Sequence, residues 1–284
     1  MDGRARPTYQ WTRYLTPSAA HRRLGLVCLG AGHQEGPLPV VGPRTMRNHV
    51  VVVVSEGRGW FSQAGGPAVP VEAPAALWLF PGVSHHYAPD GDGWAEWFVD
   101  FTGPALAAYT ELGFVDPQAP VVPLTTPEPA VRAIGRIVGA CRRGGAFLEV
   151  EASALVHEVL VALRHTRADQ DANGDPVLAV LARDACLPIS VAEHARRLGV
   201  PLAELRQTVR RLTGSSPKEY VLGLRLSRAK ELLAGSDLPV AAVARRCGYE
   251  DPAYFTRIFT RRVGLPPTEF RSQQYRGFVA ADSA

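Results

Sequence analysis

The side chains most suited to binding a partner lie between Pro252 and Arg262. Arginine and threonine recur there at three- and four-residue steps, while Phe255, Ile258 and Phe259 fall on the opposite side of the same helical period. Arginine can donate two hydrogen bonds to a guanine edge, and threonine can contact a thymine methyl group. The spacing predicts a helix that packs through its apolar side and presents its Arg/Thr side to DNA. An ordinary helical hairpin with a solvated basic face would show the same pattern.

A tight turn and a shorter helix must position this reading helix. Val240, Val243 and Ala244 form an apolar stripe, and Gly248 follows them where a left-handed helix end favours glycine. Asp251 can then cap the next helix through its carboxylate. Two helices joined by a short glycine-containing turn are typical of a helix-turn-helix motif.

The same arrangement occurs twice. The segment Ala-Arg-Arg-Leu-Gly at 195–199 matches Ala-Arg-Arg-Cys-Gly at 244–248, and 203–205 matches 253–255. Between the two copies, the apolar residues of 217–234 predict one continuous helix of about 17 residues, roughly 25 Å long. Two reading helices held by such a rod could enter successive major grooves, which lie about 34 Å apart on one face of DNA.

The outward positions of the two predicted reading helices supply the candidate DNA contacts. Some of these side chains are expected to meet base edges and about half or more to meet phosphate or nothing. The candidates are Ala203, Glu204, Arg206, Gln207, Arg210 and Arg211 on the first helix, and Ala253, Tyr254, Thr256, Arg257, Thr260 and Arg261 on the second.

The C-terminal third of the chain resembles the AraC/XylS family of bacterial transcription regulators. The resemblance is carried by SRAKELL at 227–233, PVAAVA at 239–244, YFTRIF at 254–259 and GLPPTEFR at 264–271. It implies two helix-turn-helix motifs joined by a long helix, with double-stranded promoter DNA as partner and RNA polymerase as a second partner of an activator. The first motif departs from the pattern, because Glu204 stands where the family usually has an aromatic residue.

Residues 24–101 show the short apolar runs of β-strands. The runs lie at 24–29, 49–55, 60–61, 69–71, 76–80, 85–87 and 94–101, and Gly- or Pro-rich turns, including 55–59 and 90–93, separate them. Strands at this spacing indicate an antiparallel barrel or jelly roll. Residues 1–21 show little periodicity and are predicted to be an arm that orders only in contact with something else.

This order of strands resembles the sugar-binding cupin domain of many AraC-type regulators. The matching segments are 56–59, 79–82, 85–87 and 94–103. The resemblance implies a small-molecule effector, such as a sugar, inside the barrel. Aromatic faces and planar polar groups suit a sugar, although the same aromatic residues could simply fill a core. The candidate effector residues are Arg44, Trp78, Phe80, Tyr87, Glu96 and Phe98.

From residue 129 the apolar period becomes helical, with Gly144 and Gly145 separating two helices. In the family that the chain resembles, such helices form a homodimer, whereas packing within one subunit is the alternative. The fold class expected is therefore α+β multidomain: an N-terminal antiparallel β-barrel with a helical pair, then an all-α double helix-turn-helix domain. The expected boundaries are 1–128 for arm and barrel, 129–166 for the helices, 167–175 for a flexible linker and 176–276 for the DNA-binding domain.

Charge and composition favour a cytoplasmic DNA-binding protein. From Asp175 onward the chain has 17 Lys+Arg and 11 Asp+Glu, or +6, which leaves 14 and 16, or −2, for the rest. The four cysteines are scattered, which argues against a disulfide framework or a zinc site. The sequence contains no run of 18 apolar residues and no apolar segment typical of a secretory signal, so no membrane contact is expected.

Catalytic and metal-binding motifs are missing from the sequence. It contains no GxSxG, Walker or HExxH pattern, so we expect no enzyme activity and no cofactor. His85 and His86 are adjacent and should point to opposite faces of a strand, which disfavours a metal site. Two alternatives remain: a regulator whose barrel binds no ligand and serves only for dimerisation, and a cupin enzyme with an accessory helical domain.

Overall fold

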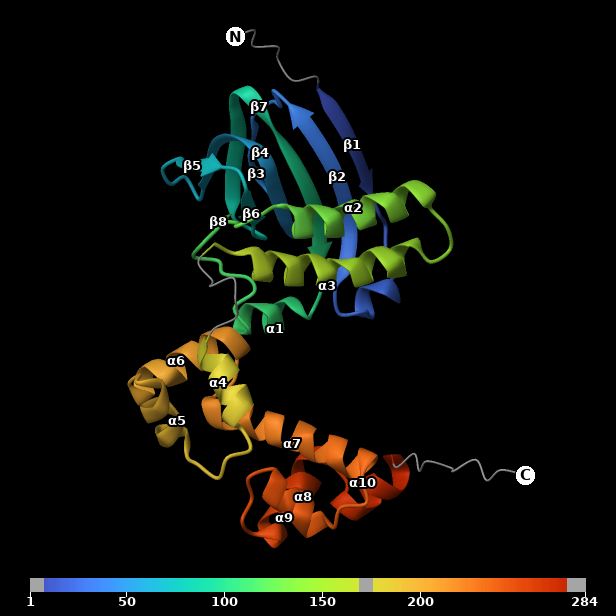
Figure 1. Cartoon of the computed structure of the whole chain (residues 1–284). Coiled ribbons are helices and arrows are strands. Elements are labelled where there is room, and N and C mark those ends of the chain that lie inside the picture. The colour runs from blue at the N-terminus through green and yellow to red at the C-terminus, as the bar shows by residue number, and fades with distance from the viewer. Residues whose placement is uncertain (1–7, 169–175, 275–284) are drawn as a thin grey trace, which may run out of the picture. The chain divides into compact units, whose positions relative to one another are not determined.

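The computed structural model describes residues 8–168 and 176–274 and divides the chain into two compact domains, 1–172 and 173–284. The N-terminal domain is an antiparallel sheet with a helical pair, and the C-terminal domain is entirely helical over the residues described (Figure 1). This confirms the predicted fold class. No helix of the described part is long and apolar enough to cross a membrane.

Eight antiparallel strands build the described part of the N-terminal domain. In space they follow the order β1-β2-β7-β4-β6-β8, with β3 added to β7 and β5 added to β4. The strands are β1 (Tyr9–Tyr14), β2 (Val27–Gly36), β3 (Val41–Thr45), β4 (His49–Gln63), β5 (Val69–Glu72), β6 (Ala75–Leu79), β7 (Ser84–Thr102) and β8 (Val121–Pro123).

Strands β4 and β7 are longer than predicted, because the expected turns at 55–59 and 90–93 are irregularities inside them. The two strands stay paired on both sides of shifts in register next to Gly57. Gly57 has φ +89°, and a Cβ there would lie 2.5 Å from the carbonyl oxygen of Gly93. Glycine therefore lets two paired backbones bulge together, and the prediction of chain reversals at these points was wrong.

The alternation of side chains along the strands divides the core of the N-terminal domain in two. Val51 and Val53 join the cluster between the sheet and the helices α2 (Glu128–Arg143) and α3 (Leu148–Thr166). Val52 points to the other side and shares an inner cluster with Phe61, from beyond the bulge of β4. The sheet therefore closes around this inner cluster, as a barrel-like domain requires.

The predicted N-terminal arm forms strand β1 on the edge of the sheet, paired with β2 from Tyr9 to Tyr14. The Arg13 guanidinium donates a 2.9 Å hydrogen bond to the Cys141 carbonyl of α2, and Arg142 lies 5.0 Å above the Trp11 ring. A strand and a helix thus order this segment. Residues 1–7 of the arm and 169–175 of the predicted linker lie outside the described residues.

Seven helices build the described C-terminal domain. They are α4 (Pro176–Asp184), α5 (Val191–Leu198), α6 (Leu202–Thr213), α7 (Pro217–Gly235), α8 (Val240–Arg246), α9 (Pro252–Val263) and α10 (Pro267–Gln274). Helices α5 and α6 form the first helix-turn-helix motif, and α8 and α9 form the second. Helix α7 gives Val221 to the core of the first motif and Leu226 and Leu233 to the core of the second. It is the connecting rod that the sequence predicts.

The predicted helix ends are confirmed. The Asp251 carboxylate accepts a 2.8 Å hydrogen bond from the Ala253 backbone N–H at the start of α9. Gly199 has φ +68° at the end of α5, where a left-handed backbone suits glycine. Gly248 has φ +80° in the second turn, and a Cβ there would lie 2.6 Å from the Cys186 carbonyl oxygen. Close packing as well as backbone conformation therefore requires glycine at that turn.

Candidate DNA interface and effector site

Both reading helices turn their predicted DNA-contacting faces to solvent. Leu205 and Val209 anchor α6, and Phe255 and Phe259 anchor α9, each with no measurable exposure. Ten of the twelve predicted residues are exposed, and the other two, Thr256 and Thr260, are half-buried. The structure thus brings each predicted set onto one helix surface.

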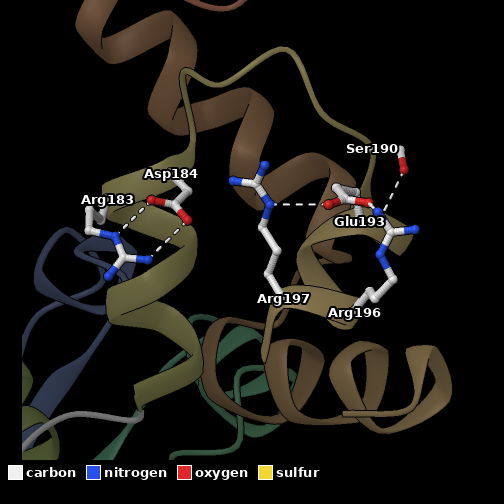
Figure 2. A network of polar contacts seen from close by, with 6 residues as sticks. All are labelled: Arg183, Asp184, Ser190, Glu193, Arg196 and Arg197. Carbon is white, nitrogen blue, oxygen red and sulfur yellow. Dashed lines mark hydrogen bonds and ion pairs between the residues drawn. The ribbon is translucent and has the colours of Figure 1, made fainter. Parts of the chain in front are cut away.

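Several arginines of the described C-terminal domain that lie outside the reading faces are held by acidic partners. Figure 2 shows Arg183 paired with Asp184, with 2.7 Å between Nε and Oδ1, and Arg196 and Arg197 paired with Glu193. On the reading faces, Arg206 and Arg210 of α6 and Arg257 and Arg261 of α9 have no hydrogen bond or ion pair to any described residue. These four guanidiniums keep their donors available for an external acceptor.

The two threonines of α9 have their hydroxyl groups engaged. The Thr256 hydroxyl donates to the Pro252 carbonyl at 2.9 Å, and the Thr260 hydroxyl donates to the Thr256 carbonyl at 2.8 Å. Each bond spans one helical turn and holds its side chain in one rotamer. This leaves the methyl group and the oxygen lone pairs for contacts outside the helix.

One arginine that sequence reasoning missed ties the two motifs together. The Arg225 guanidinium of α7 donates to the carbonyls of Ala185 and Leu187, each at 2.6 Å, and to the Gly248 carbonyl at 3.3 Å. It also lies 5.3 Å above the ring of Tyr249. The first two carbonyls precede α5, and the third belongs to the turn before α9. The residue pattern of α7 could not predict these contacts, because all three acceptor carbonyls are distant from Arg225 in sequence.

Replacing Arg225 with methionine should destabilise the C-terminal domain by about 2 kcal/mol, because three carbonyls lose a charged donor and water can replace it only in part. All five tryptophans lie between Trp11 and Trp97, so tryptophan fluorescence reports the N-terminal domain alone. We expect the urea midpoint followed by circular dichroism at 222 nm to fall while the fluorescence midpoint stays. Arg228→Met is the matched control, since Arg228 on the same helix pairs only with Glu231 among the contacts described. Equal urea midpoints for Arg225→Met and Arg228→Met would contradict this role of Arg225.

Four of the six predicted effector residues come together on the inner face of the sheet. Tyr87 and Phe98 belong to the inner cluster, and Glu96, two residues before Phe98 on β7, lies on the same face. The Glu96 carboxylate accepts a 3.0 Å hydrogen bond from the Trp94 indole N–H. Arg44 of β3 belongs to the same group. Its positive charge favours the ionised forms of both Tyr87 and Glu96, which opposes the effect of burial on their pKa values.

The structure does not bring the other two, Trp78 and Phe80, into this group. Both pack in the cluster beneath α2 and α3, where the Trp78 ring lies 6.4 Å from that of Phe101. Their neighbours Leu77 and Leu79 face inward instead. A shift of one residue along a strand reverses the face, and composition alone does not determine which alternate set points inward.

Two carboxylates are buried on the inner face. Burial raises the pKa of Glu96 to about 7 and that of Asp100, which sequence reasoning missed, to about 6. The Asn48 amide donates to Asp100 Oδ2 at 3.4 Å, whereas Asp100 Oδ1 is buried and has no hydrogen-bond partner in the described part of the chain. A buried acceptor without a partner suits a ligand that carries a hydroxyl donor.

His85 and His86 point to opposite faces, as predicted. The His85 Nε2 accepts a 3.4 Å hydrogen bond from Arg44 Nε, while its Nδ1 donates to the Val83 carbonyl at 3.3 Å. Burial lowers the pKa of His85, which agrees with this neutral form. The His86 ring instead meets the Trp60 ring edge-on at 4.7 Å. Over the described ranges, no three His, Cys, Asp or Glu side chains form a group that could hold a metal ion.

Comparisons with known proteins match both domains. Residues 30–160 match the model of the AraC-like ligand binding domain, and residues 194–273 match that of a helix-turn-helix domain. The chain is 28% identical to the arabinose operon regulatory protein of Salmonella typhimurium over 252 residues, which cover 81% of this chain and 85% of that one. It is 32% identical over 105 residues to the HTH-type transcriptional activator RhaR of Yersinia pseudotuberculosis, covering 37% of this chain and 36% of that one.

Among solved structures, the DNA-binding domain of the global transcriptional factor AdpA, in complex with a target DNA, is 30% identical. The match covers 34% of this chain and 88% of that one, with a TM-score of 0.33.

Proposed function

The chain belongs to the AraC family of transcriptional regulators, and we propose that it reads an operator through α6 and α9 under the control of a polyhydroxy effector, such as a sugar, bound at the inner cluster. The four unpaired arginines of the reading faces carry the DNA-binding part of this proposal. They lie on equivalent helices of a repeated motif, whereas Arg196 and Arg197 of α5 pair with Glu193, and Arg262 of α9 pairs with Glu219. Exposed guanidiniums at these positions suit base edges and phosphates.

Chemistry at the inner cluster supports a polyhydroxy effector. Glu96 and Asp100 supply carboxylate acceptors, Arg44 supplies donors, and Trp94 and Phe98 supply aromatic surface. Hydroxyl groups can donate to both carboxylates, and the faces of a sugar ring can pack against aromatic rings. The relative from Salmonella typhimurium is named for the arabinose operon, which places sugars first among the effectors to test.

The effector is best sought with the full chain by following tryptophan fluorescence on heating in a panel of sugars and sugar acids. A ligand at 100 times its dissociation constant stabilises the folded state by about 2.7 kcal/mol, so a true effector should raise the melting temperature of the N-terminal domain. Tyr87→Phe keeps the ring and removes the buried hydroxyl, and it should weaken that response. Leu24→Ser, at an exposed position of the same domain outside the inner cluster and the proposed dimer surface, is the control.

A response that Tyr87→Phe leaves unchanged would place the effector elsewhere. A flat response across the whole panel would favour a barrel that serves only for dimerisation.

Helix α3 supports the proposed homodimer. Phe147, which precedes the helix, is 79% exposed, and Val150 and Val161 on its surface are 43% and 40% exposed. Positions 147, 150 and 161 fall on one side of a helix, and large apolar side chains on one exposed side are typical of an interface. We propose a dimeric, cytoplasmic regulator that contacts RNA polymerase when it activates transcription.

A further inference from the structure

A pocket of about 530 Å³ lies within the C-terminal domain, between the two helix-turn-helix motifs. The start of α5 forms one wall, α7 forms another, and the turn before α9 with the first part of α9 forms a third. The residues that matter for its chemistry are His194, Lys218, Leu222, Tyr249, Tyr254 and Ile258. Its volume is typical of sites for small organic ligands, which fill about 300–1,000 Å³.

His194 lines this pocket with an unsatisfied polar side chain. The residue is 1% exposed, and neither ring nitrogen has a hydrogen-bond partner among the residues that the structure describes. Burial lowers the pKa of His194, so the ring is neutral and offers one donor and one acceptor. A buried polar group without a partner is unfavourable, and a ligand with a hydroxyl group would satisfy it.

The charges around the pocket favour an anion. Lys218 is exposed at its edge, and its ammonium group has no partner in the described ranges, while the Arg225 guanidinium forms part of the wall. Glu250 is the single acidic residue of the lining. The acidic groups that face His194 from α4 and α5 are already paired with arginines: Asp184 with Arg183, and Glu193 with Arg196 and Arg197 (Figure 2). A net positive field therefore remains at the pocket.

The walls favour an organic anion over an inorganic one. Val221, Leu222 and Ile258 provide aliphatic surface, and Tyr249 and Tyr254 provide aromatic surface. A hydrated phosphate ion would lose water against these walls without gaining contacts, whereas an aromatic ring would bury apolar area. We propose that this pocket binds a small hydroxylated aromatic carboxylic acid, with the carboxylate at Lys218, the ring against the apolar walls and the hydroxyl group at His194.

Isothermal titration calorimetry of the full chain with 4-hydroxybenzoate tests the site. We expect a dissociation constant below about 1 mM. Lys218→Met should raise this constant about tenfold or more, because a charged hydrogen bond is lost. Lys230→Met is the matched control, since Lys230 is exposed on the same helix but does not line the pocket. The neutral analogue 4-hydroxybenzamide should bind more weakly than the acid. Both lysines are exposed, so neither substitution should disturb folding.

His194→Gln adds a second arm, because glutamine can keep one donor while the imidazole disappears. The imidazole signal lost in the proton NMR spectrum of His194→Gln is that of His194, and in the wild type it should shift on addition of 4-hydroxybenzoate. Tyr87→Phe should leave this binding unchanged, which separates the pocket from the effector site of the N-terminal domain. Absence of binding at about 1 mM, or equal affinity in wild type and Lys218→Met, would overturn the proposal.

Discussion

Replacing both Arg206 and Arg257 with alanine should weaken binding to the operator by about 2–6 kcal/mol, the sum of roughly 1–3 kcal/mol for each arginine that reads a base. Each side chain is exposed, lies on a separate reading helix and has no partner in the described structure. Since the two lie in separate motifs, their effects should add. Few substitutions elsewhere on the surface could approach this loss.

The operator for this measurement can be selected from random DNA with the wild-type chain. Fluorescence anisotropy then gives the affinities of wild type, each single variant and the double variant for the operator and for an unrelated duplex. Arg196→Ala with Arg228→Ala is the control, because these arginines are held by Glu193 and Glu231. If affinity for both duplexes fell equally, Arg206 and Arg257 would contact phosphate, and the assignment to base reading would be wrong.

Raising the pH from about 5 to about 7 should destabilise the N-terminal domain, chiefly through Glu96. Its pKa is about 7 in the folded chain against 4.5 for an unburied glutamate, so between these values the folded state holds a proton that the unfolded state has released. Stability therefore falls as the pH rises through this window, by about 3 kcal/mol in all. Asp100 acts in the same direction, between its usual 3.8 and about 6.

Urea unfolding followed by tryptophan fluorescence at several pH values between 4.5 and 7.5 measures this effect. Glu96→Gln removes the titrating group, so the difference between wild type and Glu96→Gln isolates the part due to Glu96. The slope that remains combines Asp100 with His33, His49 and His85, whose pKa values burial lowers and which act in the opposite direction. Glu111→Gln is the control, since Glu111 is exposed in the same domain and should leave the slope as in the wild type. The same pH dependence in wild type and Glu96→Gln would contradict the buried state of this carboxylate.

The helix-turn-helix motifs could be predicted because their determinants are local. The Asp251 cap, the glycines at 199 and 248 and the spacing of Phe255 and Phe259 all act within a few residues along the chain. The repeat then predicted a second copy and the rod between them. Exposed reading faces followed, because a helix that buries one side through period 3.6 must turn the other outward.

The effector site could be predicted only in part. Glu96 and Phe98 are two residues apart on β7, so alternation along the strand places them on one face. Tyr87 is an odd number of residues away and joins that face only because the pairing of β7 with β4 shifts register between Pro89 and Trp94, which alternation could not predict. Trp78 and Phe80 are also two residues apart and share one face. Strand β6, however, pairs with β4 in a register that turns this face toward α2 and α3. Both faces of this sheet are apolar and buried, so hydropathy cannot distinguish them.

Sequence alone determined that this protein carries two copies of a DNA-reading motif after a β-domain, because capping, glycine turns and apolar periodicity depend on neighbouring residues. Only the tertiary structure decided which side chains meet. The Arg225 guanidinium donates to carbonyls next to both motifs, and Asp100 is buried beside Asn48. The His194 ring has no hydrogen-bond partner in the described chain. Burial and pairing at these sites depend on segments far apart in the chain, and no local spacing records which segments will pack together.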